Sequence, residues 1–115
     1  MHELSIAQSL MTTIDTWRAR NGRPRVLSAC VEIGVLAGVD PELLRNAWKA
    51  ACEAFSPEMR DCALILNLLP LKYHCAVCEK DFEAERPTPI CPVCGGAYPR
   101  HSGGHELNLK HIEVE

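Results

Sequence analysis

The 115-residue sequence contains no run of about 18 consecutive apolar residues, so it predicts no membrane-spanning helix. Its beginning lacks the basic segment and the unbroken apolar run of an export signal. Aromatic residues make up only 5%, and the only internal repeat is a pair of similar cysteine motifs. The formal net charge is −3, which gives no general attraction to polyphosphates or anionic lipids. These absences argue against nucleic-acid and membrane partners.

The sequence also lacks the arrangements that carry common enzyme chemistry. It has no glycine-rich phosphate loop and no Ser-His-Asp or Cys-His combination that can be assembled with confidence. Cys30, Cys52 and Cys62 lie in or beside apolar segments, and we interpret them as small core residues rather than nucleophiles. An odd total of seven cysteines favours a reducing cytoplasm over a disulfide framework. The sequence therefore predicts a cytoplasmic protein that is not an enzyme.

Apolar residues repeat at helical spacing in two places. From Leu4 to Trp17 they recur at three- and four-residue steps, and this first helix is expected to end near Asn21-Gly22. The second helix is expected to begin at Asp40-Pro41, which combines a capping side chain with a first-turn proline. Its apolar stripe runs from Leu43 to Phe55.

Three other segments favour strands. Residues Val26–Val35 alternate at period two, and Ala63–Leu69 is short and apolar, which suits a buried strand although its periodicity does not exclude a helix. Leu107–Val114 also alternates. The segment between the second and third of these predicted strands is rich in cysteine, proline and glycine and has few apolar residues to bury. We therefore expect the last strand to return to the sheet of the first domain, which makes the intervening segment an insertion.

Four cysteines form two matched pairs, Cys75-Ala-Val-Cys78 and Cys91-Pro-Val-Cys94. Two residues between paired cysteines let a tight turn direct both sulfurs at one ion, and two such turns complete a tetrahedral site. Gly95 and Gly96 permit the positive φ that such turns favour, whereas the first pair is followed by Glu79-Lys80. We predict one structural zinc ion at this site. Two disulfides, a redox-active pair or rubredoxin-type iron are the alternatives.

The predicted fold class is α+β, with two helices packed on a small sheet of about three strands and an inserted zinc-ribbon module. Residues 1–70 and 105–115 are expected to form the α/β domain, and residues 71–104 the zinc-binding domain. Between Leu71 and Glu106, five acidic side chains outnumber four basic ones, and thiolates on a divalent ion add negative charge. Nucleic acid should be repelled. His74 and His101 flank the zinc motif. They are expected to be hydrogen-bond donors to the zinc ligands, alternate zinc ligands, or simply exposed residues.

His2 offers a second possibility for metal binding. A terminal amine, the amide between residues 1 and 2 and an imidazole close adjacent chelate rings, and nitrogen donors in a tetragonal plane suit Ni(II) or Cu(II). Glu3 adds a carboxylate. The positive end of the helix opposes a cation by a few tenths to about 1 kcal/mol. The alternative is that His2 is simply exposed and Glu3 complements the helix dipole.

Four segments together resemble one family: the opening MHELSIAQSL, the stretch VEIGVLAGVDPELLRNAW, the cysteine pairs and the closing HELNLKHIEVE. They are similar, from end to end, to the HypA/HybF nickel chaperones of nickel–iron hydrogenase maturation. The resemblance implies Ni(II) carried as transient cargo at Met1, His2 and Glu3, and structural Zn(II) in the cysteine module. It also implies delivery, with a HypB-type GTPase, to the hydrogenase large-subunit precursor.

Two other functions compete with nickel delivery. One is a zinc-ribbon adaptor that binds only protein and has an inert N-terminus. The other is a rubredoxin-like electron carrier, which would be coloured in its native state. Nickel titration of protein with a native N-terminus separates the first of these from a chaperone.

Overall fold

The computed structural model describes residues 2–55 and 57–115, so Met1, one of the three predicted nickel ligands, lies outside the described residues. Its elements in chain order are α1 (His2–Arg20), β1 (Val26–Gly34), α2 (Pro41–Ala54), the 3-10 turn η1 (Pro57–Met59), β2 (Ala63–Leu69), β3 (Leu71–His74), β4 (Asp81–Ala84), β5 (Arg100–Gly103) and β6 (Leu107–Val114). This mixture of two helices and small sheets confirms the predicted α+β class.

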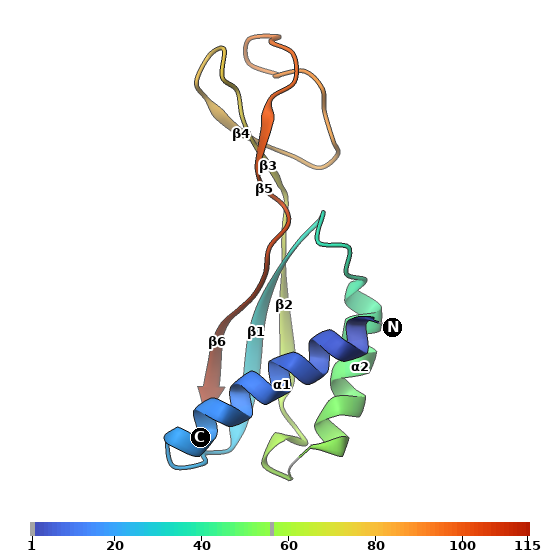
Figure 1. Ribbon diagram of the computed structural model, residues 1–115, viewed down its shortest axis with the longest axis vertical. Helices are drawn as coiled ribbons and strands as arrows, with labels where there is room; N and C mark the ends of the chain where they lie inside the picture. Colours follow the sequence, from blue (N-terminus) through green and yellow to red (C-terminus); the bar gives the residue numbers. More distant parts are fainter. Residues whose placement is uncertain (1, 56) are drawn as a thin grey trace. The chain divides into compact units, whose positions relative to one another are not determined.

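Strand β1 lies at the centre of a three-stranded sheet with the order β2-β1-β6. β1 and β2 run in the same direction because α2 returns the chain between them (Figure 1). β6 runs antiparallel to β1: the Gly34 amide donates to the Glu106 carbonyl at 2.8 Å, and the Glu115 amide donates to the Arg25 carbonyl at 3.0 Å. The predicted return of the last strand to the first sheet is confirmed.

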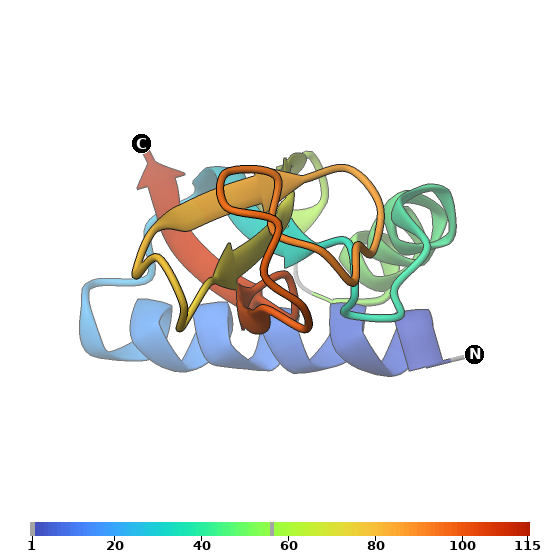
Figure 2. The same ribbon diagram turned by 90° about the horizontal axis from the view of Figure 1, so that it is seen from above.

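Helix α1 packs along one face of the strands, and its N-terminal end contacts α2 (Figure 2). Its fully buried apolar residues are Ala7, Met11 and Ile14. The predicted stripe was wrong at both ends, because Leu4 and Trp17 are 44% and 42% exposed while Glu3 and Arg18 are buried. Arg18 tolerates burial because its Nε donates to the Pro24 carbonyl at 2.7 Å. Polar side chains that find hydrogen-bond partners thus complete the buried stripe.

Helix α2 begins as predicted. The Asp40 side chain accepts hydrogen bonds from the Glu42 and Leu43 amides, and Pro41 occupies the first turn. The buried residues of α2 are Leu44, Trp48, Ala51 and Cys52. Trp48 also donates from Nε1 to the Cys62 carbonyl at 2.9 Å, which joins the helix to the segment before β2.

Strand β2 is present where it was predicted, but its burial was predicted wrongly. It is an outer strand of the sheet, and Ile65 and Leu68 are 44% and 59% exposed. An apolar composition indicates a buried strand only when both faces are covered. In β2 exposed positions alternate with half-buried ones from Ala63 to Asn67, so one face is left uncovered.

A second sheet, β4-β3-β5, forms the ribbon module. β3 pairs antiparallel with β4, so that Tyr73 faces Phe82, and with β5, so that Tyr73 faces His101. Tyr73 is 2% exposed and its ring lies 5.1 Å from the Phe82 ring and 4.5 Å from the His101 ring, between centroids. This aromatic stack is a large part of a small core.

Internal contacts divide the chain into two compact units. One comprises Met1–Val31, Val39–Asn67 and Asn108–Glu115, and the other comprises Glu32–Gly38 and Leu68–Leu107. Residues 32–38 therefore group with the cysteine-rich segment, a grouping that no local pattern predicts. The assignment of nickel to one domain and zinc to the other stays a prediction.

Candidate metal centres

The four paired cysteines meet at one point of the ribbon unit. The ligand atoms of Cys75, Cys78, Cys91 and Cys94 all lie within 4.8 Å of one another, and they are the one such group of His, Cys, Asp and Glu found among the described residues. The Cys75 and Cys94 sulfurs are 3.6 Å apart, and the Cys78 and Cys91 sulfurs are 3.9 Å apart.

These distances fit a structural zinc ion. Four sulfurs held at about 2.3 Å from a tetrahedral ion lie about 3.8 Å from each other. A disulfide requires about 2.05 Å between sulfurs, and all seven cysteines are free thiols. The two-disulfide alternative is therefore wrong for this arrangement, and the cluster is consistent with a zinc site of four cysteine ligands.

The two cysteine turns have the same backbone pattern. The Cys75 amide donates to the Lys80 carbonyl at 3.0 Å, and the Cys91 amide donates to the Gly96 carbonyl at 2.8 Å. The left-handed position is taken by Glu79 in the first turn, with φ 58°, and by Gly95 in the second, with φ 75°. Glu79 thus adopts a conformation that costs a residue with a side chain about 1–2 kcal/mol.

This asymmetry predicts opposite effects at the two equivalent positions. Glu79→Gly should stabilise the zinc-loaded protein by about 0.5–1 kcal/mol, because relief of strain exceeds the added flexibility of the unfolded chain. Gly95→Ala should destabilise it by about 1–2 kcal/mol. Urea unfolding followed by zinc release measures both. Equal effects of the same sign would contradict this account of the turns.

The pKa values of the clustered thiols bear on how they bind a cation. The Cys78 amide donates to the Cys75 sulfur and lowers the pKa of that thiol to about 6. The Lys80 amide acts in the same direction on Cys78, but burial and the neighbouring sulfurs outweigh it and raise the pKa of Cys78 to about 11. The negative charges of thiolates packed this closely repel one another, and a divalent ion offsets that repulsion.

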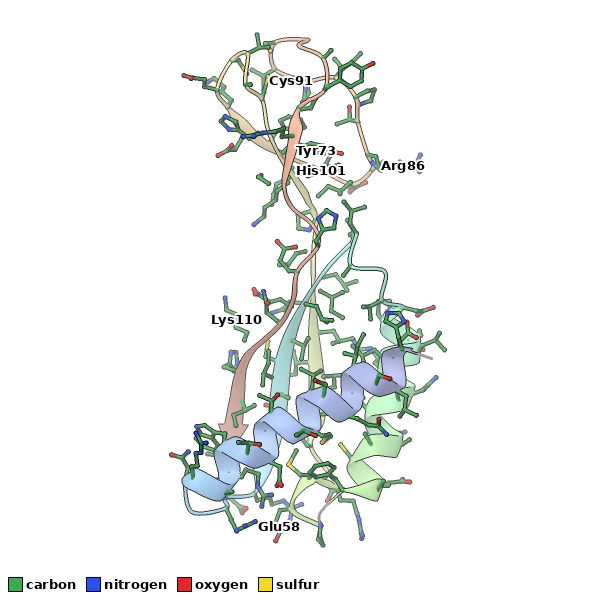
Figure 3. The ribbon with its side chains drawn as sticks, in the orientation of Figure 1. Glu58, Tyr73, Arg86, Cys91, His101 and Lys110 are labelled. Carbon is green, nitrogen blue, oxygen red and sulfur yellow. The ribbon has the colours of Figure 1, made fainter. Side chains whose placement is uncertain are left out.

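The two flanking histidines have partners of their own. His74 Nδ1 lies 2.7 Å from an Asp81 carboxylate oxygen. The His101 ring lies next to the Tyr73 ring, tilted from it by 34° (Figure 3). Neither belongs to the cysteine cluster. The structure therefore brings four of the candidate zinc ligands together and leaves the histidines outside.

At the start of α1, His2 and Glu3 lie side by side. His2 Nδ1 is 3.6 Å from Glu3 Oε1, and their side chains are 49% and 9% exposed. Glu3 Oε2 accepts a hydrogen bond from the Asp40 amide at 3.2 Å, across 37 residues of sequence. This contact holds the carboxylate against the cap of α2 and directs its other oxygen at His2. The role of Asp40 as an anchor was missed, because only its capping role has a local signal.

The Glu3 contact has a measurable pH dependence. The Asp40 hydrogen bond, followed by that of the Glu3 amide, lowers the pKa of Glu3 below 4.5. A lowered folded-state pKa gives stability that is complete above the unfolded value and lost as the pH falls through the folded value. We expect the Asp40 amide shift in NMR spectra to titrate with a midpoint below pH 4.5, and Glu3→Gln to abolish that titration. A midpoint at or above 4.5 would contradict the contact.

The three remaining cysteines are core residues, as predicted. Cys30, Cys52 and Cys62 are buried. Burial raises the pKa of Cys52 to about 11 and that of Cys62 to about 12. Both thiols are therefore protonated at neutral pH and unsuited to nucleophilic attack.

Comparisons with known proteins agree with this fold and site. A family model described as "Hydrogenase/urease nickel incorporation, metallochaperone, hypA" matches residues 1–114. The hydrogenase maturation factor HypA of Aquifex aeolicus is 37% identical over 115 residues, which is 100% of this chain and 98% of that protein. HypA of Rhodobacter capsulatus is 35% identical over 114 residues, with 99% of each chain covered.

Solved structures show the same fold. The solution structure of the Ni metallochaperone HypA from Helicobacter pylori has a TM-score of 0.68 at 23% identity, covering 99% of this chain and 97% of that one. A second solution structure of a HypA protein has a TM-score of 0.76 at 22% identity, covering 100% and 97%. Fold and site thus define a small α+β protein with an inserted four-cysteine ribbon. The chain belongs to the HypA family of hydrogenase maturation factors.

Proposed function

We propose that this protein is a nickel metallochaperone: it binds Ni(II) through Met1, His2 and Glu3 and delivers it for assembly of the nickel–iron hydrogenase active site. The observation that carries the proposal is the pairing of His2 with an anchored Glu3 in a chain that belongs to the HypA family. The imidazole, the terminal amine and the first amide supply nitrogen donors that suit Ni(II).

The exposure of this site suits a cargo ion. The His2 side chain is 49% exposed, so the ion can enter and leave without unfolding α1. The Asp40 amide fixes the Glu3 carboxylate, which therefore needs little reorganisation to approach a metal or to orient His2. The negative carboxylate also offsets the positive end of the helix.

Zinc has a different role in this proposal. Cys75, Cys78, Cys91 and Cys94 hold Zn(II), which supplies folding free energy to the ribbon unit and leaves no open coordination position. The zinc therefore braces the fold, and nickel is the ion that is handed on.

The family places the chain in hydrogenase maturation, and we propose two specific partners in the cytoplasm: a HypB-type GTPase and the hydrogenase large-subunit precursor. The role is metal transfer rather than catalysis. Acidic side chains and thiolates around the ribbon support the absence of a nucleic-acid partner. In the described part of the chain, no helix is long and apolar enough to cross a bilayer.

Hydrogenase activity in cells tests the proposal. Cells that lack the native protein should recover activity when they express this chain with its own N-terminus, and should not recover it with His2→Ala. Excess nickel in the medium should partly rescue the variant, because delivery rather than folding is lost. Full activity with His2→Ala at ordinary nickel would favour the protein-binding adaptor instead.

A further inference from the structure

We propose that the groove between α2 and β2 is a docking site for an extended acidic segment of another protein. This inference goes beyond nickel delivery, because the groove contains none of the proposed nickel or zinc ligands. It rests on two exposed cations, an apolar floor and an adjacent outer strand.

The groove has basic walls and no acid. It is lined by Arg45, Asn46, Trp48, Lys49, Cys62 and Leu64. Arg45 and Lys49 are both exposed, and neither takes part in an ion pair within the described residues. The chain as a whole has a formal charge of −3, so this positive patch runs against the overall balance.

The two cations stand one helical turn apart. Glu42 and Glu53 lie one turn before Arg45 and one turn after Lys49, but neither acid pairs with these cations among the described residues, so both cations remain available to a ligand. Their positions are separated by about 6 Å along the helix axis. Carboxylates at alternate positions of an extended chain are about 6.6–7 Å apart, which matches that spacing.

Strand β2 favours an extended partner. It is an outer strand of its sheet, lies alongside α2 (Figure 1) and contains no charged residue, proline or glycine to discourage pairing. Arg45 Nη1 donates to the Leu64 carbonyl at 3.4 Å, a long hydrogen bond that a carboxylate can replace. The opposite outer strand, β6, carries Lys110 and Glu113, which protect it.

Charge also decides against a second copy of this chain as the occupant. Two β2 strands paired about a two-fold axis would bring Arg45 and Lys49 of both copies to the same junction. Like charges juxtaposed at an interface oppose association. A partner with acidic side chains gains from the same geometry.

Peptide titration of the zinc-loaded full chain, followed by backbone amide NMR, tests the proposal. The probe is a peptide of about eight residues, with both termini blocked, in which leucine and glutamate alternate. The control is a peptide of the same length in which leucine and lysine alternate. The glutamate peptide should shift the amides of Ala63–Asn67 and of α2, and the lysine peptide should not. Added salt should weaken the binding.

Two charge-reversal variants separate a local site from general attraction. Arg45→Glu with Lys49→Glu should weaken the glutamate peptide by about tenfold or more. Arg20→Glu with Arg86→Glu changes the net charge equally at exposed positions elsewhere and should alter the affinity by less than about twofold. Equal losses in the two variants, equal binding of both peptides or no shift at millimolar peptide would overturn the proposal. Concentration-dependent shifts of β2 without peptide would also overturn it, in favour of a second copy.

Discussion

The substitution Cys91→Ser is expected to abolish zinc binding and to unfold the ribbon unit, Glu32–Gly38 with Leu68–Leu107, while α1 and α2 remain folded. Cys91 is 1% exposed, so serine leaves a polar group in a buried position and one ligand fewer. Structural zinc contributes about 10–16 kcal/mol of apparent folding free energy in small zinc modules. No other interaction among the described residues of the ribbon approaches this value.

The apolar core of the ribbon unit is too small to fold this unit without the metal. Apart from the cysteines, its fully buried large side chains are Ile33, Leu71 and Tyr73. Complete burial of one such side chain contributes about 1.5–3 kcal/mol. A core of this size cannot offset the conformational entropy of the 47 residues of this unit at about 1–2 kcal/mol each. The zinc ion is therefore required for the ribbon to fold.

Metal analysis and amide NMR measure this outcome. The wild-type protein should contain one zinc per chain, and Cys91→Ser should contain none and lose the dispersed signals of the ribbon. Cys30→Ser is the matched control, because Cys30 is buried but lies outside the cluster. It should keep its zinc. Stoichiometric zinc in Cys91→Ser, or iron in the native protein, would contradict the site.

The second large effect is expected at His2. His2→Ala should weaken Ni(II) binding by at least about 100-fold, more than loss of an outer-shell partner costs, while the zinc content stays unchanged. The imidazole closes the chelate with the terminal amine and the first amide, and Glu3 alone is a poor ligand for an ion that prefers nitrogen. An extension of a few residues before Met1 should have a similar effect, because it removes the amine.

Isothermal titration with nickel, on protein with its native N-terminus, measures both changes. His111→Ala is the control, since His111 is an exposed histidine on β6 with no proposed metal role. Its nickel affinity should equal that of the wild type. If His2→Ala and the extended protein both bind nickel normally, the N-terminal site is excluded and the ion is held elsewhere.

Much of the candidate site could be predicted because its signals are local. The two-residue spacing within each cysteine pair dictates that a tight turn presents both sulfurs together, whatever surrounds it. Asp40-Pro41 specified the start of α2 for a similar reason, because a cap depends on the next few residues only. The family resemblance added the nickel role, which composition and spacing alone left open.

The features that the sequence left undecided involve contacts between distant residues. Glu3 and Asp40 are 37 positions apart, and only the packing of α1 against α2 makes one carboxylate both an anchor and a neighbour of His2. β2 reads as a buried strand, and its exposure was decided by the face that is left uncovered. By itself the sequence determined the chemistry of the four-cysteine cluster, since ligand type and turn spacing are short-range properties. Only the tertiary structure decided how the Glu3 carboxylate is anchored beside His2 and which strand lies at the edge of the sheet, because those depend on how distant elements share a core.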